Sequence, residues 1–295
     1  AEASLAVGAV RAASPGGPGG PTPRVAVCGN VWRLSRCPQG CRDVQRALDE
    51  AGGDEQRAAL ASELRRHVWE AAQCPHANHV LQKCVTTLPP AALQFVVDEI
   101  MSKKGMVTRL AQHKYGCRVI QRILEHCTSD QVLGVAEALL TEATTLAGHP
   151  FGNYVLQDLL EHGVDDHRRR LVLTIARNVG FLGRDLYAGA LVSRAVGSGP
   201  KDVRAALAQA MLREPGLLVH MASARHAHLA VKGALDVLRG QERKVAVGSL
   251  SAEVNTLSAN RYGRAVLAYI NDGRAASGTR AAAAAAGRVG ATLAQ

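Results

Sequence analysis

Aromatic side chains are scarce in this sequence of 295 residues, where Phe, Trp and Tyr together make up 3% of the chain. Apolar residues nevertheless make up 47%, so a buried core has to consist mainly of Ala, Leu and Val. Such a core favours packed helices, because β-sandwiches draw on aromatic and β-branched residues. A chain of this length can bury one large core or several stacked small ones.

Several functional signatures are also missing. No uncharged apolar run reaches the length of a membrane span, so we expect no membrane partner. The Gly-rich segment lacks the features of a phosphate-binding loop. The sequence also offers no catalytic nucleophile paired with a general base, so we expect neither an enzyme nor a cofactor. The chain begins at Ala1 without methionine, and we expect a piece of a longer protein.

The seven cysteines are an odd number for a disulfide framework, and they indicate a reducing compartment. The Cys and His residues of the first 80 positions could suggest a zinc site. They form neither a CxxC pair nor a regular ligand spacing, so we expect no metal. Cys74, Cys84 and Cys127 are interpreted as small residues in or near the core.

Positive charge is plentiful, with 35 Lys and Arg against 25 Asp and Glu and a formal net charge of +10. This balance suggests a polyanionic partner, although charge says nothing about the fold. The Gly/Pro-rich residues 1–30 read as a disordered linker or degenerate N-terminal segment. Residues 276–295, with the alanine run Ala281–Ala286, are predicted to form a C-terminal capping helix.

A repeat occupies residues 31–275. Small residues recur at intervals of 36 to 39 residues, each preceded in most cases by a ring and followed three residues later by an apolar pair: Gly40, Ala77, Gly116, Gly152, Ala188, Ala227 and Gly263. We call them the anchor residues. They define units starting near 31, 68, 107, 143, 179, 218 and 254. Each unit is predicted to hold two longer helices and a short one. Units of this size must stack to bury their apolar faces, so the expected fold is all-α, an α-solenoid.

The stretch His113–His126 shows the repeat most clearly. Val119, Ile120, Ile123 and Leu124 form an apolar stripe at helical spacing. Cys117, Arg118 and Gln121 are predicted to face outward from the other side of the helix. Histidines recur beside the repeat turns and are interpreted as local hydrogen-bonding or packing groups: His113, His126, His149 and His162.

This stretch closely resembles the repeat motif of the Pumilio (PUF) family of RNA-binding proteins, and Gly152–Gln157 resembles the neighbouring unit. The match is strong over residues 31–178 and weaker but in phase to about 275. The resemblance implies a right-handed α-solenoid of about seven three-helix repeats that binds single-stranded RNA on its concave face, with the N-terminal repeats on the 3′ side.

The residues that follow each anchor are the candidate RNA contacts. The first and fifth positions lie one helical turn apart and can approach one base edge together, while the second position can stack between bases. The expected base-edge residues are Cys41, Gln45, Asn78, Gln82, Cys117, Gln121, Asn153 and Gln157, and the expected stacking residues are Arg42, His79, Arg118 and Tyr154. By family resemblance, Asn with Gln reads uracil and Cys with Gln reads adenine. The four units should then read 5′-UAUA-3′.

The last three units depart from this pattern. They carry Gly189, Ala190 and Ser193, then His228, Leu229 and Lys232, then Arg264, Ala265 and Ala268. None has a flat stacking residue at the second position, so we do not expect them to read bases as the family does. Ser193, His228, Lys232 and Arg264 are left as candidates for phosphate or degenerate contacts.

The expected function is sequence-specific binding of mRNA 3′ untranslated regions and post-transcriptional control of message stability or translation, by a cytoplasmic monomer. Co-repressor proteins would bind the convex face or the C-terminal repeats. Two alternatives stay open. One is a diverged Pumilio-like protein that binds structured RNA with low base specificity in the nucleolus, during ribosome biogenesis. The other is a protein–protein scaffold of the HEAT or armadillo type.

Overall fold

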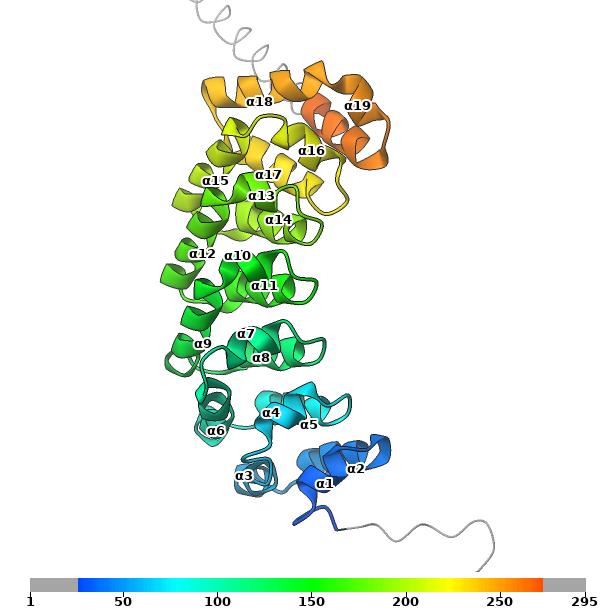
Figure 1. Cartoon of the computed structure of the whole chain (residues 1–295), viewed down its shortest axis with the longest axis vertical. Helices are drawn as coiled ribbons and strands as arrows, with labels where there is room; N and C mark the ends of the chain where they lie inside the picture. Colours follow the sequence, from blue (N-terminus) through cyan, green and yellow to red (C-terminus); the bar gives the residue numbers. More distant parts are fainter. Residues whose placement is uncertain (1–25, 273–295) are drawn as a thin grey trace, which may run out of the picture.

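The computed structural model describes residues 26–272, and the helices of this part stack into a curved column (Figure 1). The predicted all-helical solenoid is confirmed. Most of the linker predicted over residues 1–30, and the whole capping helix predicted over 276–295, lie outside the described residues. Within residues 26–272, every helix is too short or too polar to span a lipid bilayer.

Three kinds of helix alternate along the described chain. The short helices are α1 (Val31–Ser35), α4 (Val68–Gln73), α7 (Met106–Ala111), α10 (Ala143–Ala147), α13 (Val179–Leu182), α16 (Leu217–Ser223) and α19 (Val254–Ser258). Each leads into an inner helix that starts within two residues of an anchor residue: α2 (Pro38–Glu50), α5 (Ala77–Thr87), α8 (Gly116–His126), α11 (Gly152–His162), α14 (Ala188–Ser198), α17 (His228–Val237) and residues 261–272.

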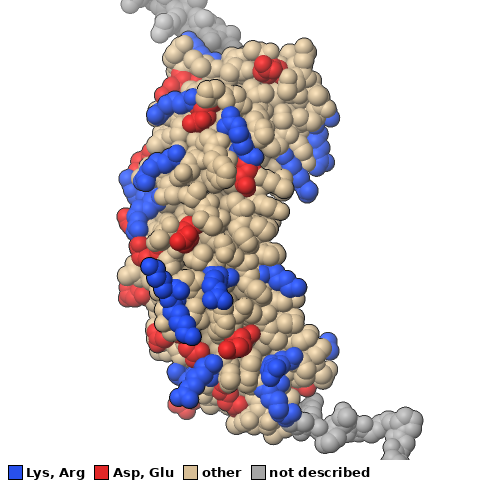
Figure 2. All heavy atoms as spheres, in the orientation of Figure 1, with Lys and Arg blue, Asp and Glu red and all other residues tan. Residues whose placement is uncertain are grey.

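The outer helices complete the first six units: α3 (Asp54–Ser62), α6 (Pro90–Met101), α9 (Ser129–Thr141), α12 (Asp165–Arg177), α15 (Lys201–Arg213) and α18 (Gly240–Ala252). They line one long side of the column, and the short and inner helices line the other (Figure 1). The molecular surface is hollowed on the side of the inner helices (Figure 2). The inner helices therefore face the concave side.

The anchor residues are small because each inner helix starts against the backbone of its own short helix. A Cβ added at Gly116 would lie 2.8 Å from the Leu110 carbonyl oxygen, and one added at Gly152 would lie 2.9 Å from that of Leu146. Contacts this close cannot be relieved by a side-chain rotation, because they are made to main-chain atoms. The glycine anchors thus mark places where the inner helix lies close to the backbone of the preceding short helix.

The position eleven residues before the anchor adopts a left-handed backbone in four units. Glycine fills it at Gly29, Gly105 and Gly216, with φ of 78°, 81° and 69°. The second unit instead places Arg66 there, with φ of 69°, the one non-glycine residue of residues 26–272 with positive φ. An L-residue pays a steric cost in this conformation that glycine avoids.

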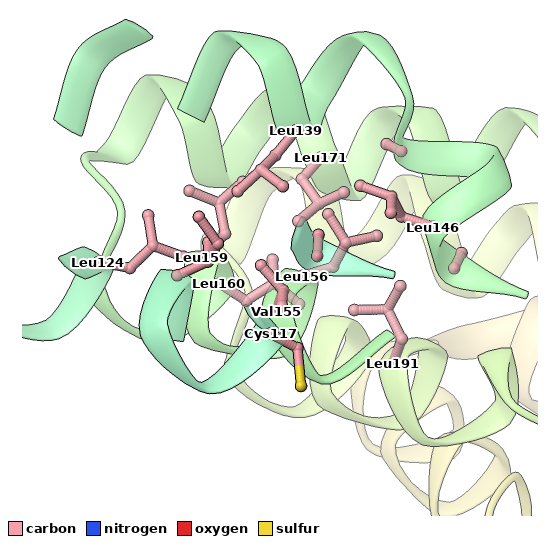
Figure 3. Packing of buried hydrophobic residues seen from close by; sticks show 14 of the residues in the cluster. Cys117, Leu124, Leu139, Leu146, Val155, Leu156, Leu159, Leu160, Leu171 and Leu191 are labelled. Carbon is pink, nitrogen blue, oxygen red and sulfur yellow. The ribbon is translucent and has the colours of Figure 1, made fainter. Parts of the chain in front are cut away.

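One continuous core runs through the stack, from Val31 to Ile270. Leucine and valine side chains of successive units meet in it, including Leu124, Leu156, Leu171 and Leu191 (Figure 3). Phe95 is its one buried aromatic residue among those described. Since each unit buries its apolar face only against its neighbours, stability is expected to depend on the interfaces between units.

Candidate nucleic-acid interface

The inner helices lie side by side and expose equivalent positions along the concave face. Helices α2, α5, α8, α11 and α14 each contact the next inner helix in the series, and Asp236 of α17 accepts a hydrogen bond from Tyr269 of the last one. Residues with the same spacing from their anchors therefore form rows that run along the column. Such a surface suits a long ligand made of similar units.

The start of several inner helices is fixed by a side-chain acceptor three residues before the anchor. His113 Nδ1 accepts hydrogen bonds from the N–H groups of Tyr115 (3.3 Å) and Gly116 (3.2 Å), and His149 Nδ1 accepts from Phe151 and Gly152, both at 3.2 Å. Burial lowers the pKa of both imidazoles, with a further lowering by the charge of Lys114 for His113. Neutral rings are required, because only an unprotonated nitrogen accepts. The prediction that these two histidines are local hydrogen-bonding groups is confirmed.

Carboxylate and amide oxygens fill the same role in two C-terminal units. Asp185 Oδ1 accepts from the N–H groups of Tyr187 (2.8 Å) and Ala188 (2.9 Å), and Asn260 Oδ1 accepts from Tyr262 and Gly263. The chain thus uses three chemically different acceptors in one structural role. Each holds the first turn of an inner helix, where free N–H groups would otherwise stay unpaired.

The side chains at the first position after each anchor are more buried than the sequence predicts. Cys41, Asn78, Cys117 and Asn153 are between 1% and 4% exposed. Asn78 Nδ2 donates to the Cys74 carbonyl at 2.7 Å, and Asn153 Nδ2 donates to the His149 carbonyl at 2.8 Å. The expectation that Cys117 faces outward is therefore wrong, because the next inner helix packs over this part of the turn.

The fifth positions lean over the first ones. In the two predicted uracil units, Gln82 Nε2 donates to Asn78 Oδ1 at 2.8 Å and Gln157 Nε2 donates to Asn153 Oδ1 at 3.0 Å. Each asparagine oxygen thereby fixes how the glutamine amide is turned. The glutamine oxygen and its second N–H are left to form new hydrogen bonds, and one donor with one acceptor matches the edge of uracil.

The two predicted adenine units fix the glutamine in other ways. Gln45 Nε2 approaches the thiol sulfur of Cys41 at 3.1 Å, and that thiol donates to the His76 carbonyl of the next unit. Gln121 is only 7% exposed and so does not face outward as predicted. Its amide donates to Asp158 on α11, and its oxygen accepts from Arg118. Burial raises the pKa of both the Cys41 and Cys117 thiols, so both are protonated at neutral pH.

Asp158 was not singled out from the sequence. It occupies the sixth position after its anchor, where the other N-terminal inner helices carry Arg46, Lys83 and Arg122. Burial raises the pKa of this carboxyl, and the hydrogen bond from Gln121 opposes that rise. Asp158 could have been identified from the sequence, because it is acidic at a position where the other three helices carry a basic residue.

The second positions are the exposed row. Arg42, His79 and Arg118 are exposed, and the Tyr154 side chain is 49% exposed. These flat or planar groups stand at equivalent places on four successive inner helices, above the buried first positions. Aromatic and guanidinium planes in such a row can stack on successive bases.

The last three units have the short and inner helices of the repeat, but the exposed row of flat side chains does not continue along them. Ser193 Oγ lies 2.9 Å from the Gly189 carbonyl and 2.7 Å from the His226 carbonyl, so its hydrogen is held by the backbone. The His228 ring lies 5.1 Å from that of Tyr262, the Lys232 ammonium lies over Tyr269, and the Arg264 guanidinium donates to the Ser258 carbonyl. Whether any of these side chains contacts RNA stays a prediction.

Comparison with known proteins identifies the repeat. The family model described as "Pumilio-family RNA binding repeat" matches residues 30–65, 67–101, 107–140 and 143–176. The Suppressor protein MPT5 of Saccharomyces cerevisiae is 28% identical over 113 residues, which are 36% of this chain and 13% of that protein. A Pumilio domain-containing protein of Schizosaccharomyces pombe, C6G9.14, is 24% identical over 231 residues, 78% of this chain and 33% of that protein. The chain thus spans a third or less of these relatives.

A solved structure extends the likeness through the divergent units. The Puf3 RNA-binding domain bound to a Cox17 RNA 3′ UTR recognition sequence (site A) matches with a TM-score of 0.70 and 25% identity, over 82% of this chain and 74% of that one. Its coverage exceeds the four units that the family model matches, so the C-terminal units keep the fold while losing the sequence pattern. Residues 30–176 of this chain therefore carry four RNA-binding repeats of the Pumilio family.

Proposed function

We propose that this protein binds single-stranded RNA sequence-specifically along its concave face and reads 5′-UAUA-3′ with its first four units. The proposal rests on the exposed row Arg42, His79, Arg118 and Tyr154. Beside this row, three units hold a glutamine against the first-position side chain, and the third unit holds Gln121 through Arg118 and Asp158. The row provides stacking planes and the glutamines provide hydrogen bonds, which are the two things an unpaired base offers a protein.

The direction and order of reading follow from the family resemblance. Asn153 with Gln157 would read the first uracil, Cys117 with Gln121 the first adenine, Asn78 with Gln82 the second uracil and Cys41 with Gln45 the last adenine. The buried thiols support the adenine assignment, because an uncharged thiol leaves the glutamine amide as the main polar group of its pair.

We further propose that the protein acts on mRNA 3′ untranslated regions in the cytoplasm, by binding without turnover, and brings repressor proteins to the message. The Puf3 structure was solved with a 3′ UTR recognition sequence, which makes this class of RNA the first to test. The outer helices lie on the far side of the column from the proposed RNA face (Figure 1). A protein partner that binds the outer helices would therefore not cover the RNA.

A titration at one fixed salt concentration tests the proposal. The protein is mixed with a labelled RNA that contains UAUA and with four RNAs that each carry one changed base. Each change is expected to weaken binding by about 1–3 kcal/mol if edge contacts here resemble those to duplex DNA. Equal affinity for all five RNAs would favour the low-specificity alternative. No binding even at low salt would favour a protein–protein scaffold.

A further inference from the structure

A hollow of about 230 Å³ opens on the concave side next to the fourth unit. It is lined by Asn153 and Tyr154 of α11, by Leu186, Tyr187 and Ala190 around the start of α14, and by His226 of the following unit. Three successive units contribute, and the fifth is at the centre. The hollow is therefore continuous with the proposed uracil-binding pair and with the last stacking side chain of the row.

The hollow lies where the fifth unit has a small residue in place of a large one. Ala190 occupies the second position, which is Arg42, His79, Arg118 or Tyr154 in the N-terminal units, and it lines the hollow. Gly189, at the first position, does not line the hollow, because it packs closely against Ala227. The short side chain of Ala190 therefore leaves the space that Tyr154 and Tyr187 border.

The lining suits a flat ring and not a phosphate. It contains no lysine, arginine, aspartate or glutamate. Leu186 is 74% exposed and Tyr187 is 42% exposed, so large apolar surface faces water beside the hollow. Its volume lies below the ~300–1,000 Å³ of typical small-molecule sites, which fits a single base better than a whole nucleotide.

The fifth unit also lacks the means to read a base edge. Gly189 has no side chain, and the hydroxyl hydrogen of Ser193 is held by the carbonyl oxygens of Gly189 and His226. Tyr154, Leu186, Tyr187 and Ala190 would offer a base in the hollow ring faces and aliphatic carbon, which every base satisfies equally.

We propose that this hollow holds the nucleobase immediately 5′ of the UAUA element, and that it accepts any base. The inference rests on the proposed function for the position of the RNA. The recognised RNA would then have five nucleotides, 5′-NUAUA-3′, in which the first is bound but not read. Tyr154 would stack on one side of this base, while Leu186 and Tyr187 enclose it.

The experiment compares six RNAs on the full chain at one salt concentration. Four have the sequence NUAUA with each base as N, the fifth has an abasic site in place of N, and the sixth has N followed by a scrambled tetranucleotide. We expect the first four to bind within about threefold of one another. The abasic RNA should bind about 5- to 150-fold more weakly, which corresponds to the ~1–3 kcal/mol of one stacked base.

A variant and its control locate the effect. Tyr187→Ala should weaken binding of NUAUA and leave binding of the abasic RNA unchanged, because only the former fills the hollow. Phe181→Ala is the matched control, since Phe181 is 67% exposed on α13 and does not line the hollow. It should change neither affinity.

The outcomes separate this inference from the proposed function. Equal binding of the abasic RNA and NUAUA would contradict the proposal that the hollow binds a base. A strong preference for one base at N would contradict the proposal that it accepts any base. Either result leaves UAUA reading intact. If the scrambled RNA binds as well as NUAUA, the proposed function itself fails.

Discussion

The side-chain amide of Gln121 donates a hydrogen bond to the carboxylate of Asp158, which lies on the next inner helix. The pair links the third unit to the fourth at the floor of the proposed RNA face. With its nitrogen turned toward Asp158, Gln121 directs its oxygen toward Arg118. In the uracil units, an asparagine of the same helix orients the glutamine instead.

Asp158→Ala should loosen base discrimination at the second letter of the RNA. Without the carboxylate the Gln121 amide can turn either way, so the preference for adenine should fall by roughly the ~1 kcal/mol of one hydrogen bond. The measurement is the ratio of dissociation constants for UAUA and UCUA. Asp130→Ala, at an exposed position of α9, is the control and should leave the ratio unchanged. An unaltered ratio for Asp158→Ala would contradict the orienting role.

Acidification should weaken the first turns of α8 and α11. Burial lowers the folded-state pKa of His113 and His149 below the ordinary 6.5, so the neutral form is favoured by folding. Their contribution to stability is therefore present above pH 6.5 and is lost as the pH falls from 6.5 through the lowered pKa. Unfolding midpoints measured between pH 7 and pH 5 should decrease accordingly.

Replacing both histidines by asparagine gives the matched test of that pH effect. Asn260 already accepts the equivalent hydrogen bonds in the seventh unit, and an amide oxygen does not titrate. The double variant His113→Asn with His149→Asn should fold and show a shallower pH dependence than the natural sequence. If the unfolding midpoints of both proteins depend on pH with the same slope, the pH dependence comes from titratable groups other than these two histidines.

Gly116→Ala should destabilise the protein, since the new methyl group would lie 2.8 Å from the Leu110 carbonyl oxygen. Overpacking of this kind costs about 1–3 kcal/mol. Gly197→Ala, on α14 with no heavy atom within 4 Å of the added methyl, is the control and should stabilise by ~0.5–1 kcal/mol. Chemical unfolding of the two variants measures the contrast. Equal effects would mean that the close approach at the anchor is not needed.

Arg66→Gly should stabilise the protein by about 1 kcal/mol. Glycine removes the ~1–2 kcal/mol steric cost of the left-handed backbone, and part of this gain is offset by the greater freedom of the unfolded chain. The backbone N–H of residue 66, which donates to Glu99 at 2.6 Å, is kept. Gly105→Ala tests the converse at the same register of the third unit and should lower the unfolding midpoint. A lower midpoint for Arg66→Gly would show that the arginine side chain stabilises the fold.

The repeat could be predicted from the sequence because the anchor residues face main-chain atoms, where only small side chains fit. Gly116 and Gly152 are the clearest cases. The exposure of single side chains could not be predicted, since it depends on the neighbouring unit. Gln121 has helical spacing typical of an exposed residue, yet α11 covers it and supplies Asp158 as its partner. The hollow beside Tyr154 likewise arises from residues of three units, and no single repeat predicts it.

The most direct measurement changes the pair that would read the first uracil. In the double variant Asn153→Ser with Gln157→Glu, a carboxylate replaces the amide, and a carboxylate accepts from the two N–H donors on the guanine edge. Dissociation constants for UAUA and GAUA are measured with the natural protein and the variant at one salt concentration. We expect the preference to shift from UAUA towards GAUA, with the other three positions unchanged. A preference that stays with UAUA in the variant would contradict the assignment of the base-reading positions.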